Sequence, residues 1–211
     1  MFDQFARIGK ALASGLRIEI LDLLAQSEQS VEVLAQTLGQ STQNISQHLQ
    51  VLRATKLITS RKEGNFVMYR VTGDDIVGLV GALQNVAHTH LSEVDEILEQ
   101  FDSHRHEFEA LNADELMRRA REGSIQVFDV RPPREFDAGH LPGAVNVPLS
   151  KLEETFATLP KDASVVAYCR GKYCLMAYAA VDFLTSSGLE AQRLSVGFSE
   201  WRLGDLPVVK T

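Results

Sequence analysis

Apolar residues in the first half of the chain recur mostly at the spacing of α-helices. One such face is formed by Leu16, Ile20 and Leu24. Ser30 and Ser41 precede two further apolar segments and can cap the helices that begin there. This half is therefore expected to be mainly α-helical. The predicted helices cover residues 16–24, 31–38, 42–54 and 74–103.

Two of these predicted helices are joined by a turn at Gly39 and are followed by two alternating segments. Glycine can take the left-handed conformation that ends a helix. The alternating segments, 57–61 and 67–71, predict a β-hairpin that turns at 63–65. Two short helices joined by a glycine-containing turn indicate a helix-turn-helix, and the hairpin beside it is interpreted as a wing.

The pattern changes near residue 106, beyond which short apolar runs alternate with helical segments. Such alternation predicts a parallel sheet covered by helices. We therefore expect two domains, one over residues 1–103 and one over residues 104–211. The expected strands are 125–130, 145–147, 164–168 and 191–194, and the expected helices are 149–159 and 174–187.

Composition narrows the class of protein. The chain has 211 residues, of which 45% are hydrophobic, and a formal net charge of −7. This charge argues against general coating of nucleic acid, although it allows a local basic patch. No apolar run is long enough to span a membrane and the N-terminus has no signal-peptide pattern, so we expect a cytoplasmic protein without membrane contact.

A basic patch lies in residues 41–72, where Glu63 is the single acidic residue. Its cations can neutralise phosphates, and amides on the polar face of the helix 42–54 can read adenine edges in the major groove. Any one glutamine fits an ordinary solvated surface equally well, but the combination with the turn and the basic wing favours binding to double-stranded DNA. The predicted DNA contacts are Gln43, Asn44, Ser46, Gln47, His48, Gln50, Arg53, Arg61 and Lys62.

The clearest chemical signal is the segment 169–174, Cys-Arg-Gly-Lys-Tyr-Cys, between an apolar strand and a helix start. Backbone N–H groups converge at such a turn and favour an anion. They would lower the pKa of the Cys169 thiol, and two neighbouring cations would add to this effect. A small apolar residue at the end of a core strand is the plainer alternative. We expect Cys169 to be a nucleophile in a binding loop completed by Arg170, Gly171, Lys172, Tyr173 and Cys174.

Cys174, the second of the two cysteines, has two interpretations. It packs under the loop as a small residue, or it is a resolving thiol that attacks a sulfur-loaded Cys169. The residues alone leave both open.

Four histidines are candidate metal ligands by residue type. They form two pairs, each spaced by two residues, and such neighbours do not share a helix face. We therefore expect neither a metal site nor a cofactor. These residues are His88, His90, His104 and His106.

Three segments of the first half resemble the arsenic-repressor (ArsR-type) winged-helix family: GLRIEIL at 15–21, SQHLQVLR at 46–53 and RKEGNFVMY at 61–69. The resemblance implies a homodimer whose interface includes the terminal helices. Its operator would hold two half-sites about 34 Å apart. Members that sense arsenite or soft metals carry cysteines near the reading helix, whereas this half has none, so the signal is expected to be sensed elsewhere.

The second half resembles the rhodanese family over about residues 107–211, through FDVR at 128–131, EFDAGHLPGAVNVP at 135–148, the cysteine segment and GFSEW at 197–201. The resemblance implies a parallel sheet with helices on both faces. It also implies that Cys169 accepts sulfur and that the loop backbone holds the persulfide. Phosphatases and arsenate reductases with this fold use a longer loop, which disfavours those activities here. The residues interpreted as scaffold are Asp129, Arg131, Glu135 and His140.

Together these observations predict a transcriptional regulator whose rhodanese-like module accepts sulfur from thiosulfate, a persulfide or a polysulfide and couples it to operator binding. Two rival interpretations stay open. One is a rhodanese-type sulfurtransferase whose DNA-binding half is only a tether. The other is an arsenic-responsive regulator or reductase that uses both cysteines.

Overall fold

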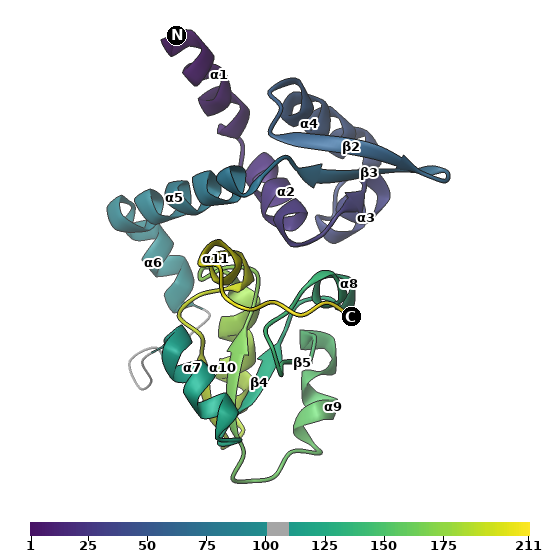
Figure 1. The fold of residues 1–211 in the computed structure, drawn as a ribbon. Coiled ribbons are helices and arrows are strands. Elements are labelled where there is room, and N and C mark those ends of the chain that lie inside the picture. Colours follow the sequence, from purple (N-terminus) through teal and green to yellow (C-terminus); the bar gives the residue numbers. More distant parts are fainter. Residues whose placement is uncertain (101–109) are drawn as a thin grey trace. The chain divides into compact units, whose positions relative to one another are not determined.

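The computed structural model describes residues 1–100 and 110–211 (Figure 1). The chain forms two compact units, Met1–Leu83 and Gln84–Thr211. The predicted division between residues 103 and 104 falls outside the described residues and stays a prediction. Within the described ranges, no helix has the length and apolar character needed to cross a membrane.

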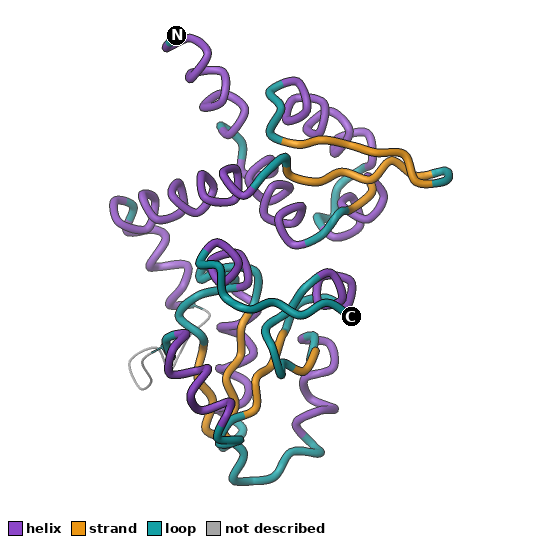
Figure 2. The backbone as a smooth tube through the Cα atoms, in the orientation of Figure 1, coloured by secondary structure: helices purple, strands orange, loops and turns teal. Residues whose placement is uncertain are grey.

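The first unit combines short helices with a three-stranded antiparallel sheet (Figure 2). Its elements are α1 (Phe2–Leu12), α2 (Gly15–Gln26), β1 (Gln29–Ser30), α3 (Val31–Thr37), α4 (Thr42–Ala54), β2 (Ile58–Glu63), β3 (Phe66–Val71) and the start of α5 (Asp74–His90). The strand order is β1-β3-β2. β2 and β3 form the predicted hairpin, and only Gly64 and Asn65 separate them.

The two helices of the helix-turn-helix begin at the predicted caps. The Ser30 hydroxyl accepts the N–H of Val33 at 3.4 Å, and the Ser41 hydroxyl accepts the N–H of Asn44 at 3.2 Å. Between the helices Gly39 has a φ of +62°, which glycine adopts without steric penalty. Local sequence signals therefore set the ends of α3 and α4.

The core of the first unit is aliphatic. Ile45, Leu49 and Leu52 point inward from α4 and are at most 1% exposed. They pack in one cluster with Ile20 from α2 and Leu34 from α3. Burying each such side chain contributes about 1.5–3 kcal/mol, so this cluster fixes the orientation of α4. The opposite face of α4 is thereby turned to the surface.

The prediction of a single helix over residues 74–103 is wrong. α5 ends at His90, Leu91 has an extended backbone with φ −117° and ψ 105°, and α6 (Ser92–Glu99) begins anew. Histidines lie in the last turn of α5 and acidic residues in the first turn of α6, an arrangement that both helix dipoles favour. Apolar spacing that continues across one extended residue hides such a break.

The second unit contains the predicted parallel sheet with helices on both faces (Figure 2). Its strands are β4 (Gln126–Asp129), β5 (Val145–Asn146), β6 (Ser164–Tyr168) and β7 (Glu190–Arg193), in the order β5-β4-β6-β7. The further helices are α7 (Ala113–Arg121), α8 (Pro133–Ala138), the 3-10 helix Leu149–Lys151, α9 (Leu152–Phe156), α10 (Leu175–Ser186) and α11 (Phe198–Leu203). The described residues confirm the predicted fold class for both halves.

Successive residues of β6 face opposite sides of the sheet. Val165 and Ala167 join the apolar cluster that includes α9 and α10. Val166 and Tyr168 join the cluster that includes α7 and α11. An inner strand covered on both faces has to be apolar at every position, which explains the continuous apolar run in the sequence.

Candidate functional site

The surface face of α4 presents the predicted base-reading amides. Gln43, Gln47 and Gln50 are exposed, and so is Arg53 near the end of the same helix. The buried residues of α4 are all apolar. An amphipathic helix with amides on its free face is the arrangement that major-groove reading requires.

The other three predicted contacts of α4 are turned partly toward the protein. The Asn44 amide donates to Gln40 Oε1 at 2.9 Å, and the Ser46 hydroxyl donates to the Thr42 carbonyl at 2.7 Å. His48 Nδ1 is buried and has no hydrogen-bond partner in the part of the chain that is described. Their roles as DNA contacts stay predictions.

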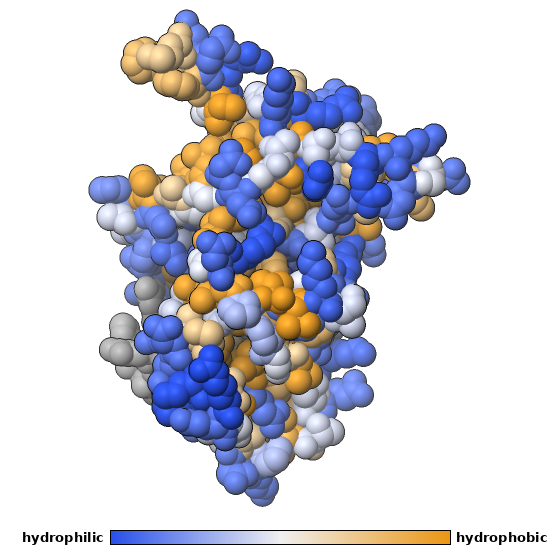
Figure 3. All heavy atoms as spheres, viewed as in Figure 1, coloured by the Kyte–Doolittle hydropathy of each residue, from blue (hydrophilic) through white to orange (hydrophobic). Residues whose placement is uncertain are grey.

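The wing is less basic than the local charge count predicts. Glu28 lies 2.6 Å from the Arg61 Nε and 3.6 Å from the Arg70 Nε. Arg61 also contacts Glu63. The hydrogen bond to Glu28 is the main cause that raises the pKa of Arg61. Lys62 is exposed, and Figure 3 shows a hydrophilic hairpin tip.

Cys169 and Cys174 bracket the turn between β6 and α10, which we call the cysteine loop (residues 169–174). Cys169 follows the last residue of β6, and Cys174 precedes the first residue of α10. Their sulfurs form a disulfide, with Cα atoms 6.1 Å apart. Disulfides usually join Cα atoms about 4.4–6.8 Å apart, so the loop backbone suits this bond. The disulfide carries no charge, and anion binding by the loop stays a prediction.

The start of α11 holds the backbone of the cysteine loop. The Phe198 N–H donates to the Cys169 carbonyl, and the Ser199 N–H donates to the Arg170 carbonyl, each at 2.8 Å. These two bonds join segments almost thirty residues apart in the sequence. They fix the position of the loop relative to the end of β6.

A close approach between two glycines completes this arrangement. A Cβ atom on Gly197 would lie 2.2 Å from the Gly171 Cα, so position 197 admits only glycine without a shift of the loop. The Glu200 carboxylate accepts the Gly197 N–H at 2.8 Å and the Lys172 N–H at 3.3 Å. One amide predicted to hold an anion therefore already faces a carboxylate. The N–H groups of Gly171 and Tyr173 have no hydrogen-bond partner among the residues described.

The two cations of the cysteine loop differ in their surroundings. The Arg170 guanidinium binds the buried Glu135 carboxylate, with nitrogen to oxygen distances of 2.8 Å and 2.9 Å. The Lys172 ammonium lies 4.8 Å from the ring centroid of Tyr173, within range of a cation–π contact. Glu135 therefore compensates the charge of Arg170, and Lys172 remains the cation better placed to attract an anionic donor.

A buried ion pair lies under the cysteine loop. Asp129 and Arg131 are fully buried, and Arg131 Nη2 lies 2.6 Å from Asp129 Oδ2. The Tyr168 hydroxyl donates to the same oxygen at 2.5 Å, and the guanidinium stacks 4.1 Å from the Phe198 ring centroid. Burial, reinforced by the Asp129 charge, raises the pKa of Tyr168. This agrees with the interpretation of the pair as scaffold.

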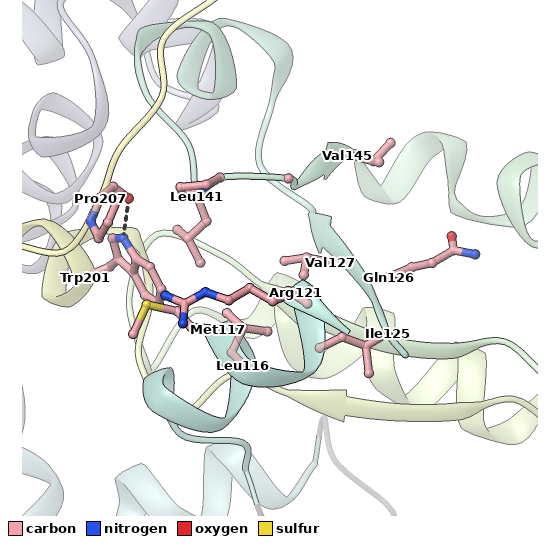
Figure 4. A pocket seen from close by; sticks show the side chains of 13 residues that line it. Leu116, Met117, Arg121, Ile125, Gln126, Val127, Leu141, Val145, Trp201 and Pro207 are labelled. Atoms are coloured by element: carbon pink, nitrogen blue, oxygen red, sulfur yellow. Dashed lines mark hydrogen bonds between the residues drawn. The ribbon is translucent and has the colours of Figure 1, made fainter. Parts of the chain in front are cut away.

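A pocket of about 700 Å³ opens beside α7, and no residue of the cysteine loop lines it (Figure 4). Within the described chain, Arg121 is the single charged residue of its wall. The Trp201 indole N–H donates to the Pro207 carbonyl at the edge of the pocket, at 2.8 Å. The wall of this pocket has no thiol, imidazole, hydroxyl or carboxylate side chain.

Two of the histidines that the structure describes contact other protein groups. His88 Nε2 lies 3.1 Å from Asp95 Oδ1, and the His140 ring stacks on a phenylalanine ring with centroids 3.7 Å apart. Among the described residues, no three histidine, cysteine or acidic side chains are grouped as a metal would require. His104 and His106 lie outside the described residues.

Together the two units define a class of protein, a winged-helix DNA-binding domain joined to a rhodanese-like domain. Family models match the chain as a helix-turn-helix domain over residues 12–61 and as a rhodanese-like domain over residues 112–203. The HTH-type transcriptional regulator Rv0324 of Mycobacterium tuberculosis is 43% identical over 208 residues, covering 99% of this chain and 91% of the relative. The chain belongs to this family of ArsR-type transcriptional regulators that carry a rhodanese-like domain.

Two solved structures are each similar to one half of the chain. The homodimeric winged helix-turn-helix domain of Mb0332 from Mycobacterium bovis is 46% identical, with a TM-score of 0.41, and the match covers 43% of this chain and 83% of that one. A rhodanese-related protein from Thermoplasma volcanium is 29% identical, with a TM-score of 0.43, and the match covers 48% of this chain and 98% of that one.

Proposed function

We propose that this transcriptional regulator reads its operator through α4 and the wing and accepts reactive sulfur as a persulfide on Cys169. One observation carries the proposal. Cys169 directly follows β6, an inner strand of the sheet, and its loop precedes the twelve-residue helix α10. Two backbone hydrogen bonds from α11 hold that loop in place. A reactive thiol needs such a fixed turn next to a helix start.

Reduction of the disulfide prepares the proposed acceptor. It frees the Cys169 thiol, whose thiolate form is the nucleophile. With thiosulfate as donor, the thiolate attacks the outer sulfur, the sulfur–sulfur bond of thiosulfate breaks, and sulfite leaves with the electron pair. The product is a persulfide anion on Cys169. The N–H groups of Gly171 and Tyr173 are the proposed donors to this anion.

Homodimer formation is part of the proposal. Large apolar side chains stay exposed on α1 and α5, and exposed apolar groups of this size mark interaction surfaces. A second copy of the chain would cover them and place two reading helices about 34 Å apart, one helical turn of DNA. The residues are Phe2, Phe5, Leu79, Leu83 and Val86.

Operator reading predicts different effects for Gln47 and Lys62. Gln47→Ala should weaken binding by about 1–3 kcal/mol on a duplex selected from a random library, with a smaller loss on a scrambled duplex. Lys62→Ala should weaken both duplexes alike and reduce the salt slope by about one, because a phosphate contact is lost. Fluorescence anisotropy at several salt concentrations measures both. The exposed Gln126, on β4, supplies the control Gln126→Ala. Equal losses on both duplexes for Gln47→Ala would rule out base reading by this residue.

Sulfur acceptance is tested in the reduced Cys174→Ser protein, where Cys169 is the sole thiol. After treatment with thiosulfate or glutathione persulfide, the intact mass should rise by one sulfur atom, located on the peptide that contains Cys169. Additional replacement of Cys169 by serine should abolish the gain. An unchanged mass in Cys174→Ser with both donors would contradict the proposal.

A further inference from the structure

We infer that Cys174 is the resolving thiol of this site: it attacks the Cys169 persulfide, releases hydrosulfide and closes the disulfide between the two residues. The inference rests on the proposed acceptance of sulfur by Cys169. It adds a second reaction at the cysteine loop, in which each sulfur atom that Cys169 has accepted is released as hydrosulfide.

The backbone holds the two thiols within reach of each other. Their Cα atoms are 6.1 Å apart and their sulfurs are bonded. The Cys174 N–H donates to the Gly171 carbonyl at 3.0 Å, and the Cys169 carbonyl accepts the Phe198 N–H at 2.8 Å. Both ends of the loop are thus tied by hydrogen bonds that do not involve the sulfurs. Reduction of the disulfide would leave these bonds intact, so the reduced loop keeps the thiols close.

Proximity favours Cys174 over any thiol from outside. Cys169 packs in the apolar cluster with Val165, Ala177 and Ala180. An outside thiol has to diffuse to the persulfide, whereas the Cys174 sulfur is already in contact with the Cys169 sulfur. Holding two reactants in contact gives an effective concentration far above that of any cellular thiol.

The position of Cys174 also favours its reactive form. It is the residue in front of α10, whose twelve residues provide a helix dipole and free N–H groups. These lower the pKa of a thiol, and the thiolate is the species that attacks a disulfide-type bond. Cys174 is partly exposed, in contrast to Cys169, so it can lose its proton to water.

The step balances without an outside oxidant. The Cys174 thiolate attacks the Cys169 sulfur, a bond forms between the two cysteine sulfurs, and the bond to the outer sulfur breaks. The outer sulfur leaves with the electron pair of that bond, takes up the proton that the Cys174 thiol has given up and is released as hydrosulfide. The two cysteine sulfurs are oxidised to a disulfide and the transferred sulfur is reduced to sulfide. An external reducing dithiol restores the two thiols by disulfide exchange.

Wild-type protein and Cys174→Ser are compared after reduction with a dithiol, removal of the reductant and addition of glutathione persulfide without oxygen. The wild type should lose the mass of two hydrogen atoms and release one equivalent of sulfide per chain. Cys174→Ser should keep the mass of one added sulfur and release none. Cys174→Ala serves as a second variant, and wild type without persulfide controls for other oxidation.

The possible failures are separable. A wild type that keeps one added sulfur as stably as Cys174→Ser would overturn the role of Cys174 and leave sulfur acceptance intact. If neither variant at position 174 gains sulfur and the wild type releases no sulfide, sulfur acceptance by Cys169 is itself overturned. If both variants misfold, the wild-type result alone tests the role of Cys174, because a stable mass gain without sulfide release contradicts the inference.

Discussion

Asp129→Ala is expected to destabilise the rhodanese-like unit by about 3–5 kcal/mol, because it leaves a buried guanidinium without its counter-charge. Arg131 is fully buried and binds Asp129 through two nitrogens. The Tyr168 hydroxyl loses its acceptor in the same variant. Water cannot replace these partners while the site stays closed, so the substitution lowers the free energy of unfolding.

The single tryptophan of the chain makes this loss measurable in the full-length protein. Trp201 is 1% exposed and lies in the rhodanese-like unit, so its fluorescence during urea unfolding reports on that unit. Asp162→Ala, at an exposed carboxylate of the same unit, is the control and should change stability by less than about 0.5 kcal/mol. Asp129→Asn keeps the shape of the side chain and part of its hydrogen bonding, so its loss of stability should lie between those of Asp129→Ala and Asp162→Ala. A loss below about 1 kcal/mol for Asp129→Ala would show that the ion pair is replaceable.

The sequence predicts the elements whose signals are local. Ser30 and Ser41 cap α3 and α4 because each hydroxyl accepts a free backbone N–H of the first helical turn. This hydrogen bond does not depend on the fold of the rest of the chain. The apolar run of β6 follows from its burial on both faces. These features depend on a few neighbouring residues, so the amino-acid order is sufficient to predict them.

Short elements and breaks escape the same reasoning. α7, α8 and α11 were not predicted, because helices of six to nine residues show too few turns to establish a helical period. The two-residue strand β1 is too short for an alternating pattern. The break at Leu91 interrupts the backbone without interrupting the apolar spacing.

The acidic partners of the candidate site residues could not be predicted from the sequence for a different reason. Glu28 binds Arg61, Glu135 binds Arg170, and Glu200 accepts the N–H of Lys172. In every pair the two residues are more than twenty-five positions apart in the sequence. Local charge counts therefore overestimated both the basic wing and the positive charge of the cysteine loop, and only the fold shows the compensation.

Cys169→Ser is expected to remove the whole response of operator binding to reactive sulfur. The reading helix α4 and the cysteine loop belong to separate compact units, so serine at 169 should leave operator affinity without sulfur unchanged. It removes the thiolate that accepts sulfur and also one partner of the disulfide. Coupling between the units requires two states with different operator affinities, and Cys169 chemistry is the proposed input that selects between them.

The most direct measurement determines operator affinity and intact mass on the same sample, before and after glutathione persulfide. The wild type should change affinity in step with the fraction of chains whose mass has changed, and Cys169→Ser should change neither. An affinity shift in Cys169→Ser equal to that of the wild type would contradict the account, and so would complete modification of Cys169 with an unaltered affinity.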